Sequence, residues 1–280
     1  MTTAIRDILL YMETYPNRTP RWALDEAVRL ADQFGARLSG ILCETHIPAV
    51  GNWLSDKFAH TNALVATENI RSREAAQELL DEFSLLVSED RRGEQFLVEC
   101  GLIGNPTEPA RLARTHDLAV VPVETNVEYQ VAAEGLIFDS GRPVLLLPQP
   151  VSSGRRFDNV IIGWDGGRSA ARALAEALPI CRTARSIRVL AITGEKALDA
   201  ALILKEVHRH LVCHDLTSSM EEVPADGCDA GTALLKRGVE TGADLLIMGA
   251  YGHSRTREFV LGGATRSVIH DPRLPVLLCH

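Results

Sequence analysis

The stretch Asp244-Leu-Leu-Ile-Met-Gly249-Ala-Tyr-Gly252-His-Ser-Arg-Thr-Arg-Glu-Phe-Val-Leu-Gly262-Gly263-Ala264-Thr265 carries the strongest fold signal in this chain. An apolar run typical of a buried strand ends on Gly249, and Gly252 follows three residues later. Gly262 and Gly263 then precede a segment predicted to be helical. A strand, a glycine loop and a helix in this order predict an α/β fold, with the loop at the carboxyl edge of a parallel sheet.

The same order of elements occurs twice. The first half predicts strands at 5–11, 37–43, 95–100, 116–123 and 143–147, and helices at 22–34, 61–89 and 107–115. The second half predicts strands at 157–164, 186–193, 216–223, 244–249 and 275–279, and helices at 170–181, 196–212, 229–241 and 265–270. Such alternation favours right-handed crossovers. We predict two tandem Rossmann-like domains, 1–148 and 156–280, each a mostly parallel five-stranded sheet with helices on both faces.

The glycine loop has no counterpart in the first half. Asp117-Leu-Ala-Val-Val-Pro122 matches Asp244-Leu-Leu-Ile-Met-Gly249, and Pro143 matches Pro275. The first half is five residues shorter between these landmarks. Pro122 also has no N–H to offer a ligand. The sequence therefore predicts one half with a ligand loop and one without.

Composition limits the function classes. The net charge is -8, and it divides into -9 for residues 1–150 and +1 for residues 151–280. An acidic chain argues against general nucleic-acid binding, which needs a basic face. No apolar run reaches the ~18 residues that span a bilayer, and no secretory leader is visible. The cysteines are scattered and form no CxxC, which favours a reducing cytoplasm: Cys43, Cys100, Cys181, Cys213, Cys228 and Cys279.

The loop residues suit a phosphate. A glycine at the strand end lets the chain turn and lets a ligand approach, and amides at a helix start have no partner within the helix. Gly262 and Gly263 leave those amides uncovered, and Thr265 adds a hydroxyl donor. Asp165, which follows the first strand of the second half, offers a carboxylate to a base or a ribose. A purely structural role stays open for both the loop and Asp165.

This arrangement resembles the universal stress protein family in its tandem two-domain form, whose fold is called adenine nucleotide alpha hydrolase-like. The most specific part is Gly249-x2-Gly252-x9-Gly262. ATP-binding members have Ser or Thr next, whereas this chain has Gly263. The resemblance implies a stress-response protein that binds ATP or a related adenine nucleotide, with or without magnesium. The residues it implies at that site are Asp165, Ile192, Met248, Gly249, Gly252, Gly262, Gly263, Ala264 and Thr265.

The resemblance also implies a role for the first half. Glu13 and Thr14 stand in place of Asp165 and Gly166, so we predict that residues 1–148 bind no ATP. In this family the last strands associate edge to edge, which predicts intramolecular pairing of 143–147 with 275–279 and satisfies exposed strand edges. A homodimer of the whole chain stays open.

Other function classes have less support in the sequence. No lysine lies in the 244–280 segment and no P-loop is present, so we expect no catalytic residue and at most slow ATP hydrolysis. His210 and His214 stand at i,i+4 with Cys213 between them, but the irregular ligand spacing argues against a metal site. A nucleotide-independent interaction module, or a binder of small apolar ligands, is the main alternative. Its candidate surface is the apolar group Trp53, Leu54, Phe58, Leu64 and Val65, for which core packing is the competing interpretation.

Overall fold

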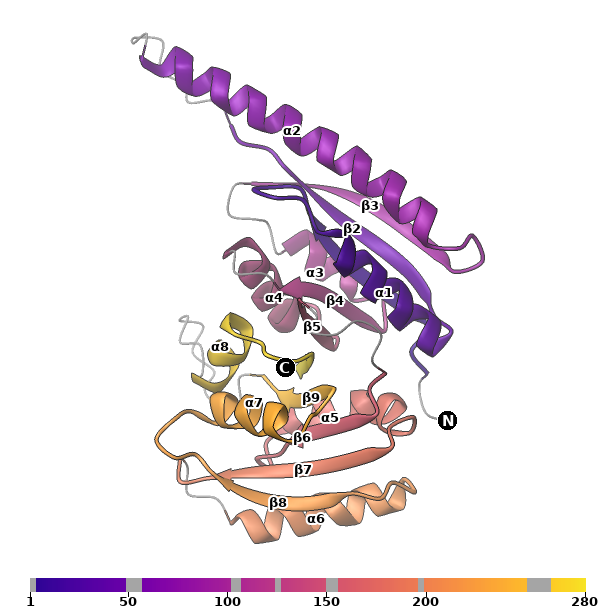
Figure 1. Cartoon of the computed structure of the whole chain (residues 1–280), viewed down its shortest axis with the longest axis vertical. Helices are drawn as coiled ribbons and strands as arrows, with labels where there is room; N and C mark the ends of the chain where they lie inside the picture. The colour runs from indigo at the N-terminus through magenta and orange to yellow at the C-terminus, as the bar shows by residue number, and fades with distance from the viewer. Residues whose placement is uncertain are drawn as a thin grey trace.

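The computed structural model describes residues 4–48, 57–101, 107–123, 127–149, 156–195, 199–250 and 263–280. One ten-stranded sheet runs through it in the order β3-β2-β1-β4-β5-β10-β9-β6-β7-β8 (Figure 1). The first-half strands are β1 Asp7–Glu13, β2 Arg37–Thr45, β3 Arg92–Cys100, β4 Leu118–Val123 and β5 Val144–Pro148. The second-half strands are β6 Asn159–Gly163, β7 Ser186–Thr193, β8 Ser219–Pro224, β9 Leu245–Gly249 and β10 Val276–Cys279.

Helices cover both faces of this sheet. One face holds α1 Arg21–Phe34, α2 Lys57–Leu86, α5 Arg168–Cys181 and α6 Ala200–Cys213. The other holds α3 Thr107–Ala113, α4 Val127–Asp139, α7 Ala230–Glu240 and α8 Gly263–His270. Each face has its own buried cluster of apolar side chains. Strands such as β4, buried throughout, read as continuous apolar runs because both sides are covered. The predicted α/β class and helix layers are confirmed.

The two halves repeat one another. Within each half all strand pairs are parallel, and the strand order is the same. Asp117 accepts hydrogen bonds from the N–H groups of Arg6 and Asp7, while Asp244 accepts one from Asn159. In both halves an aspartate before the fourth strand therefore holds the start of the first.

The halves join through their last strands. β5 and β10 pair antiparallel, with Leu145 opposite Leu277. This confirms the predicted intramolecular pairing, and it makes the two half-sheets one. Arg172 of α5 adds a hydrogen bond of 2.9 Å to the carbonyl of Gly141, across the same boundary.

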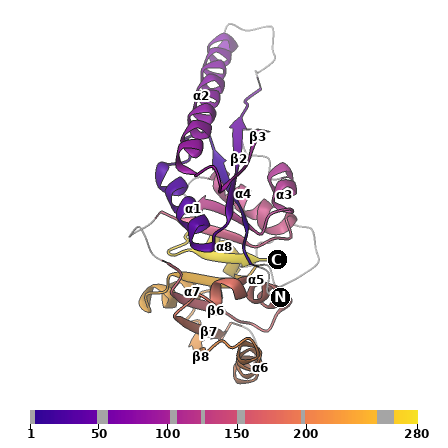
Figure 2. The same cartoon turned by 90° about the vertical axis from the view of Figure 1, so that its right-hand side faces the viewer.

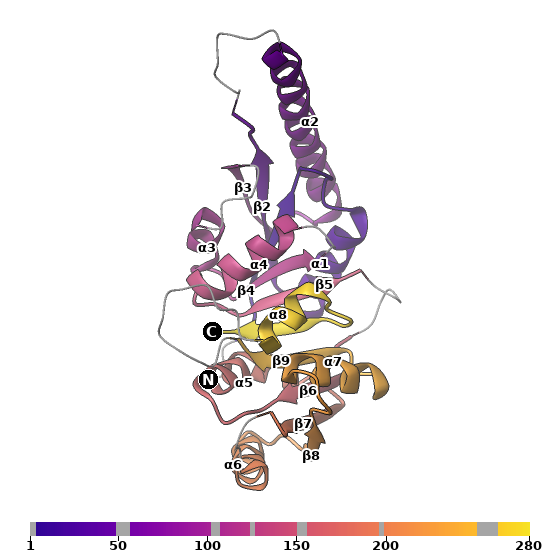
Figure 3. The ribbon, with the colours of Figure 1, turned by 90° about the vertical axis from the view of Figure 1, so that its left-hand side faces the viewer.

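Helix α4 was missed by the sequence analysis, which predicted no helix between 116–123 and 143–147. The segment Val127–Asp139 lacks a clear polar face because it packs against α3, α8 and the sheet. Amphipathic periodicity marks a helix with one solvent-facing side and weakens when several sides are covered. Helix α2, in contrast, is not covered along its whole length, because its amino-terminal part extends beyond the sheet (Figures 2 and 3).

No helix within the described ranges is long and apolar enough to cross a membrane.

Candidate functional site

The order of strands reverses between β6 and β9. Their last paired residues are Ile162 and Ile247. Beyond these residues the two strands separate. The chain after β6 remains hydrogen-bonded to β7, because Trp164 donates its N–H to the carbonyl of Leu190 at 2.8 Å, whereas β9 remains paired with β10 as far as Gly249. We call the carboxyl ends of β6 and β9 the second-half switch point. Open parallel sheets bind their ligands at such points.

The first half has a matching switch point at the ends of β1 and β4. There the last paired residues are Leu10 and Val120. Counting three residues on from Leu10 and from Ile162 places Glu13 opposite Asp165 in the repeat. Counting two from Val120 and from Ile247 places Pro122 opposite Gly249. The strand registers thus confirm the alignment of the halves that the sequence predicted.

Asp165 starts a turn at the second-half switch point. Its Oδ1 accepts a hydrogen bond of 2.8 Å from the N–H of Gly167, immediately before α5 begins. Gly166 between them has a φ of 71°, a left-handed conformation that favours glycine. The side chain of Asp165 is half-buried. It therefore shapes the loop at the place where a ligand contact was predicted.

Gly249 brings the end of β9 against the start of α5. A Cβ added there would lie 2.4 Å from the backbone nitrogen of Ala170 and 2.6 Å from the carbonyl carbon of Ser169. Backbone atoms cannot move aside as a flexible side chain can. The glycine is thus required for close helix–strand packing, a reason that sequence reasoning had not given.

Helix α8 leads into β10, which is parallel to β9, so its first turn begins on the side of the sheet where β9 ends. Gly263 is exposed, and among the described residues an added Cβ would meet Asp229 Cβ, at 3.6 Å. Ala264 is half-buried, and its carbonyl oxygen faces Gly231 of α7 so closely that only glycine fits. Thr265 is 3% exposed, so its side chain lies in the core rather than at the open end of the helix. Gly263 is the part of the predicted phosphate cradle that the structure leaves open.

Asp229 is a neighbour of Gly263 that sequence reasoning missed. It caps α7, accepting hydrogen bonds from the N–H and hydroxyl of Thr232 at 3.1 and 2.7 Å, and from the hydroxyl of Ser267 at 2.8 Å. Partial burial raises its pKa, but these hydrogen bonds outweigh that effect and leave the pKa below its ordinary value. The Asp-x-x-Thr spacing was the available signal. An ionised carboxylate beside Gly263 opposes an anion unless a cation accompanies it.

The remaining predicted residues divide into two groups. Ile192 and Met248 are 7% and 5% exposed and belong to the core cluster beneath α7 and α8. Gly252 and Gly262, with the loop side chains between them, lie outside the described residues. The structure therefore places Asp165 and Gly249 beside the start of α5, and Gly263 and Ala264 beside the start of α7.

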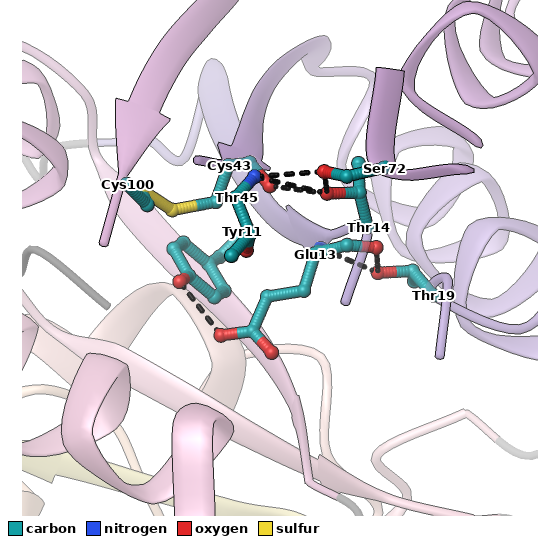
Figure 4. The surroundings of a disulfide bond; sticks show 8 residues. All are labelled: Tyr11, Glu13, Thr14, Thr19, Cys43, Thr45, Ser72 and Cys100. Atoms are coloured by element: carbon teal, nitrogen blue, oxygen red, sulfur yellow. Dashed lines mark hydrogen bonds between the residues drawn. A yellow bond between two sulfur atoms is a disulfide. The ribbon is translucent and has the colours of Figure 1, made fainter. Parts of the chain in front are cut away.

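The first-half switch point is filled by its own side chains. Glu13, 3% exposed, accepts a hydrogen bond of 2.8 Å from the hydroxyl of Tyr11 (Figure 4). Thr19 bonds the backbone N–H of Glu13 and pairs with the hydroxyl of Tyr129 at 2.8 Å. By the same register, Tyr11 stands where the second half has Gly163. A buried carboxylate and two tyrosines thus fill the end of β1 and β4.

Strand β2 is fixed to α2 beside this cluster. Thr14 pairs with the hydroxyl of Ser72 at 2.6 Å and donates to the carbonyl of Cys43 at 2.9 Å. Ser72 also accepts the N–H of Thr45 at 2.9 Å (Figure 4). A network of buried hydroxyl groups therefore holds the end of β2 to the helix above it.

A disulfide joins Cys43 of β2 to Cys100 of β3. The Cα atoms are 5.6 Å apart, and both residues are 2% exposed. The sequence analysis had predicted no disulfide, because it took the scattered cysteines as a sign of a reducing environment. Spacing could not reveal the pair, because 57 residues separate its members and only the β2–β3 register brings them together.

The structure also bears on the two alternatives considered above, the metal site and the apolar surface. The rings of His210 and His214 meet edge to face with centroids 4.7 Å apart. Within the described ranges, no three His, Cys, Asp or Glu side chains are grouped to hold a metal ion. Leu64, in contrast, is 61% exposed on α2, so it is not core packing. Trp53 and Leu54 lie outside the described residues, as does the side chain of Phe58.

Comparison with known proteins agrees with this geometry. Residues 156–280 match the model of the universal stress protein family. A universal stress protein from Archaeoglobus fulgidus has the same fold with a TM-score of 0.71 and 16% identity, covering 97% of this chain and 95% of that one. A putative universal stress protein from Pseudomonas aeruginosa gives a TM-score of 0.56 and 18% identity, covering 99% and 93%. No curated protein matches the chain.

The likeness to the Archaeoglobus fulgidus protein extends through nearly all of both chains, so it includes the first half, which the family model does not cover. The internal repeat found above explains why. The C-terminal half of this chain belongs to the universal stress protein family, and the N-terminal half repeats the same fold in tandem.

Proposed function

We propose that the second half binds ATP or a related adenine nucleotide at its switch point and that the first half binds none. The chain then acts as a regulatory stress-response protein, with nucleotide binding as its input. The proposed contacts are Asp165, Gly249, Gly263 and Ala264 at the edge, Ile192 and Met248 beneath them, Thr265 through its backbone, and Gly252 and Gly262 in the loop.

The observation that carries this proposal is the exposed Gly263 at the start of α8, together with the separation of β6 from β9 beyond Ile162 and Ile247. Gly263 is an exposed residue at a helix start, and the N–H groups of a helix start favour an anion. Asp165, on the neighbouring strand end, supplies an acceptor for a hydroxyl or a base N–H. A polar acceptor at one end and an anion site at the other suit a nucleotide.

The carboxylate of Asp229 argues for a divalent cation with the nucleotide. It lies next to Gly263 and stays ionised at neutral pH. Mg²⁺ is usually held by one or two carboxylates together with the phosphates of its ligand, so Asp229 fits such an ion. The cation would offset the repulsion between carboxylate and phosphate. We therefore expect magnesium to raise the affinity for ATP.

Isothermal titration of ATP into the full chain tests the proposal. We expect one site per chain with magnesium and weaker binding with a chelator present. Gly263→Val should weaken binding at least tenfold, because the branched side chain covers the amide while the 3.6 Å to Asp229 Cβ leaves room to fold. Glu13→Gln is the matched control in the first half and should bind as the parent does. Absence of binding to the parent chain with magnesium would end the proposal.

A second candidate function is a nucleotide-independent interaction module. Leu64 and Ile70 favour it, at 61% and 58% exposed on a helix that projects past the sheet. The double variant Leu64→Asp, Ile70→Asp leaves both switch points unchanged. Loss of the protein's cellular function in this variant, with the ATP affinity of the parent chain retained, would favour the interaction module.

The compartment proposed is the cytoplasm. Four of the six cysteines are free thiols, as is common where glutathione keeps thiols reduced.

A further inference from the structure

We infer that Cys43 and Cys100 form a reversible redox site, which is a dithiol in a reducing medium and closes to the disulfide on reaction with a low-molecular-weight disulfide. The inference is independent of nucleotide binding. It rests on where the two residues lie in the sheet and on what holds each of them.

The two cysteines have unequal support. Cys43 lies on β2, between β1 and β3, and its carbonyl accepts the hydroxyl of Thr14 in the network that ties β2 to α2. Cys100 is the last residue of β3, which has one neighbouring strand, and the next residue, Gly101, is exposed. Ends of edge strands open locally at low cost in free energy. Cys100 can therefore meet a small reagent although it is buried in the closed fold.

Both redox states fit the same backbone. The backbones of β2 and β3 are paired from Leu38 on β2 to Cys100 at the end of β3, and this pairing does not depend on the sulfur–sulfur bond. The N–H of His46 adds a hydrogen bond of 2.8 Å to the carbonyl of Cys100. A reduced cysteine packs as a small apolar side chain, as the apolar cluster around Tyr11 requires. The Cα separation of 5.6 Å already lies in the range of disulfides. Oxidation and reduction thus require only an opening of the strand end.

The reaction is a thiol–disulfide exchange. The thiolate of Cys100 attacks one sulfur of the small disulfide, whose sulfur–sulfur bond breaks and whose leaving thiolate takes up a proton. The thiolate of Cys43 then attacks the sulfur of Cys100 in the mixed disulfide and releases the second small thiol. Two electrons and two protons pass from the cysteine pair to the reagent.

The other cysteines lack this arrangement. Burial raises the pKa of Cys181 to about 12, and burial with the nearby Glu176 raises that of Cys279 to about 12. Both are also free cysteines, so neither belongs to a cysteine pair that could close to a disulfide. Cys213 is exposed at the end of α6 and serves as a control for simple surface reactivity.

The position of the cysteine pair in the sheet connects it to the first-half switch point. By the strand registers, Cys43 occupies in the first half the place that Ile192 occupies in the second. The pair therefore lies against the filled first-half switch point, with Tyr11 in the same cluster (Figure 4). Oxidation ties the edge strand to that cluster, and reduction frees its end.

The test equilibrates the native full chain in buffers of oxidised and reduced glutathione, blocks free thiols by alkylation, and digests with trypsin. The peptides 38–57 and 93–111 each contain one of the two cysteines and no other. We expect them to be linked in the oxidised buffer and separate in the reduced buffer, in both directions of approach. Failure to link, or a link that opens only after denaturation, would overturn the inference.

Hydrogen exchange of the parent chain provides a second readout, and two variants serve as its controls. The amides of residues 98–100 should exchange about tenfold more slowly in the oxidised than in the reduced chain, because the link holds the strand end closed. Cys213→Ser should keep this response, whereas Cys43→Ser should lose it and carry glutathione on Cys100. Equal exchange in both redox states would also contradict the inference.

Discussion

The two switch points are built on the same strand order but end in different chemistry. In the first half, Tyr11 and Glu13 turn into the sheet edge and bind one another, with Thr19 and Tyr129 around them. In the second half, Gly163 and Asp165 occupy the positions of that pair and leave the edge to the backbone and one half-buried carboxylate. The comparison teaches that a repeat can keep its fold while one copy fills with side chains a sheet edge that the other copy leaves to backbone and a single carboxylate.

The largest expected difference between the halves is their response to a reductant. Opening the Cys43–Cys100 link frees a 57-residue loop in the unfolded chain, which costs about 4 kcal/mol of stability by loop-closure entropy. Chemical denaturation with and without dithiothreitol, followed by exchange of core amides in each half, measures it. We expect the loss in β1–β5. An equal loss in both halves would show that they unfold as one unit.

A methyl group at Gly249 tests the close packing at the second-half switch point. Gly249→Ala places a Cβ within 2.4 Å of backbone, so we expect a loss of about 3 kcal/mol in the free energy of unfolding. Pro122→Ala, the matched change in the first half, should cost less than about 1 kcal/mol because that position already carries a side chain. Urea titrations of both variants give the numbers, and similar costs would remove this distinction between the halves.

One substitution in each half tests whether ATP binds in the second half alone. Gly263→Val should weaken ATP binding at least tenfold, or about 1.4 kcal/mol, with little change in stability. Tyr129→Phe, in the first half, should leave ATP binding unchanged and cost about 1 kcal/mol of stability, because Thr19 loses a buried partner. Calorimetry and urea unfolding of both variants separate the effects. Weakened ATP binding in Tyr129→Phe would place the ligand in the wrong half.

The smallest expected effect is a pH dependence from Asp229. Its pKa is lowered in the folded chain, so its stabilising contribution is present above the ordinary pKa of about 3.9 and is lost as pH falls through the lower folded value. Asp229→Asn should therefore cost a few tenths of a kcal/mol at pH 7 and less near pH 3, since the group is partly exposed. Urea midpoints at both pH values measure this. A cost that grows toward low pH would contradict it.

Much of this comparison was predictable from the sequence. The strands of both halves, the order of elements and the absence of a glycine loop in the first half follow from local apolar runs and their repetition, whereas the pairing of 143–147 with 275–279 was implied by the resemblance to the universal stress protein family. The first three features depend on residues close together in the chain, so periodicity and turn residues report them.

The features that were missed depend on contacts between distant segments. Tyr129 meets Thr19 across 110 positions, and Cys43 meets Cys100 across 57. Asp229 approaches Gly263 only because α7 and α8 cross closely at Gly231. Helix α4 was hidden by burial on several sides. Packing, rather than local pattern, decides each of these.

The antiparallel junction of β5 with β10 has a geometric consequence. It reverses the strand direction halfway across the sheet, so the carboxyl ends of the two parallel halves point to opposite rims. No single small molecule can touch both Glu13 and Asp165. Any communication between them has to travel through the β5–β10 seam or the helices α4 and α8 that contact one another above it.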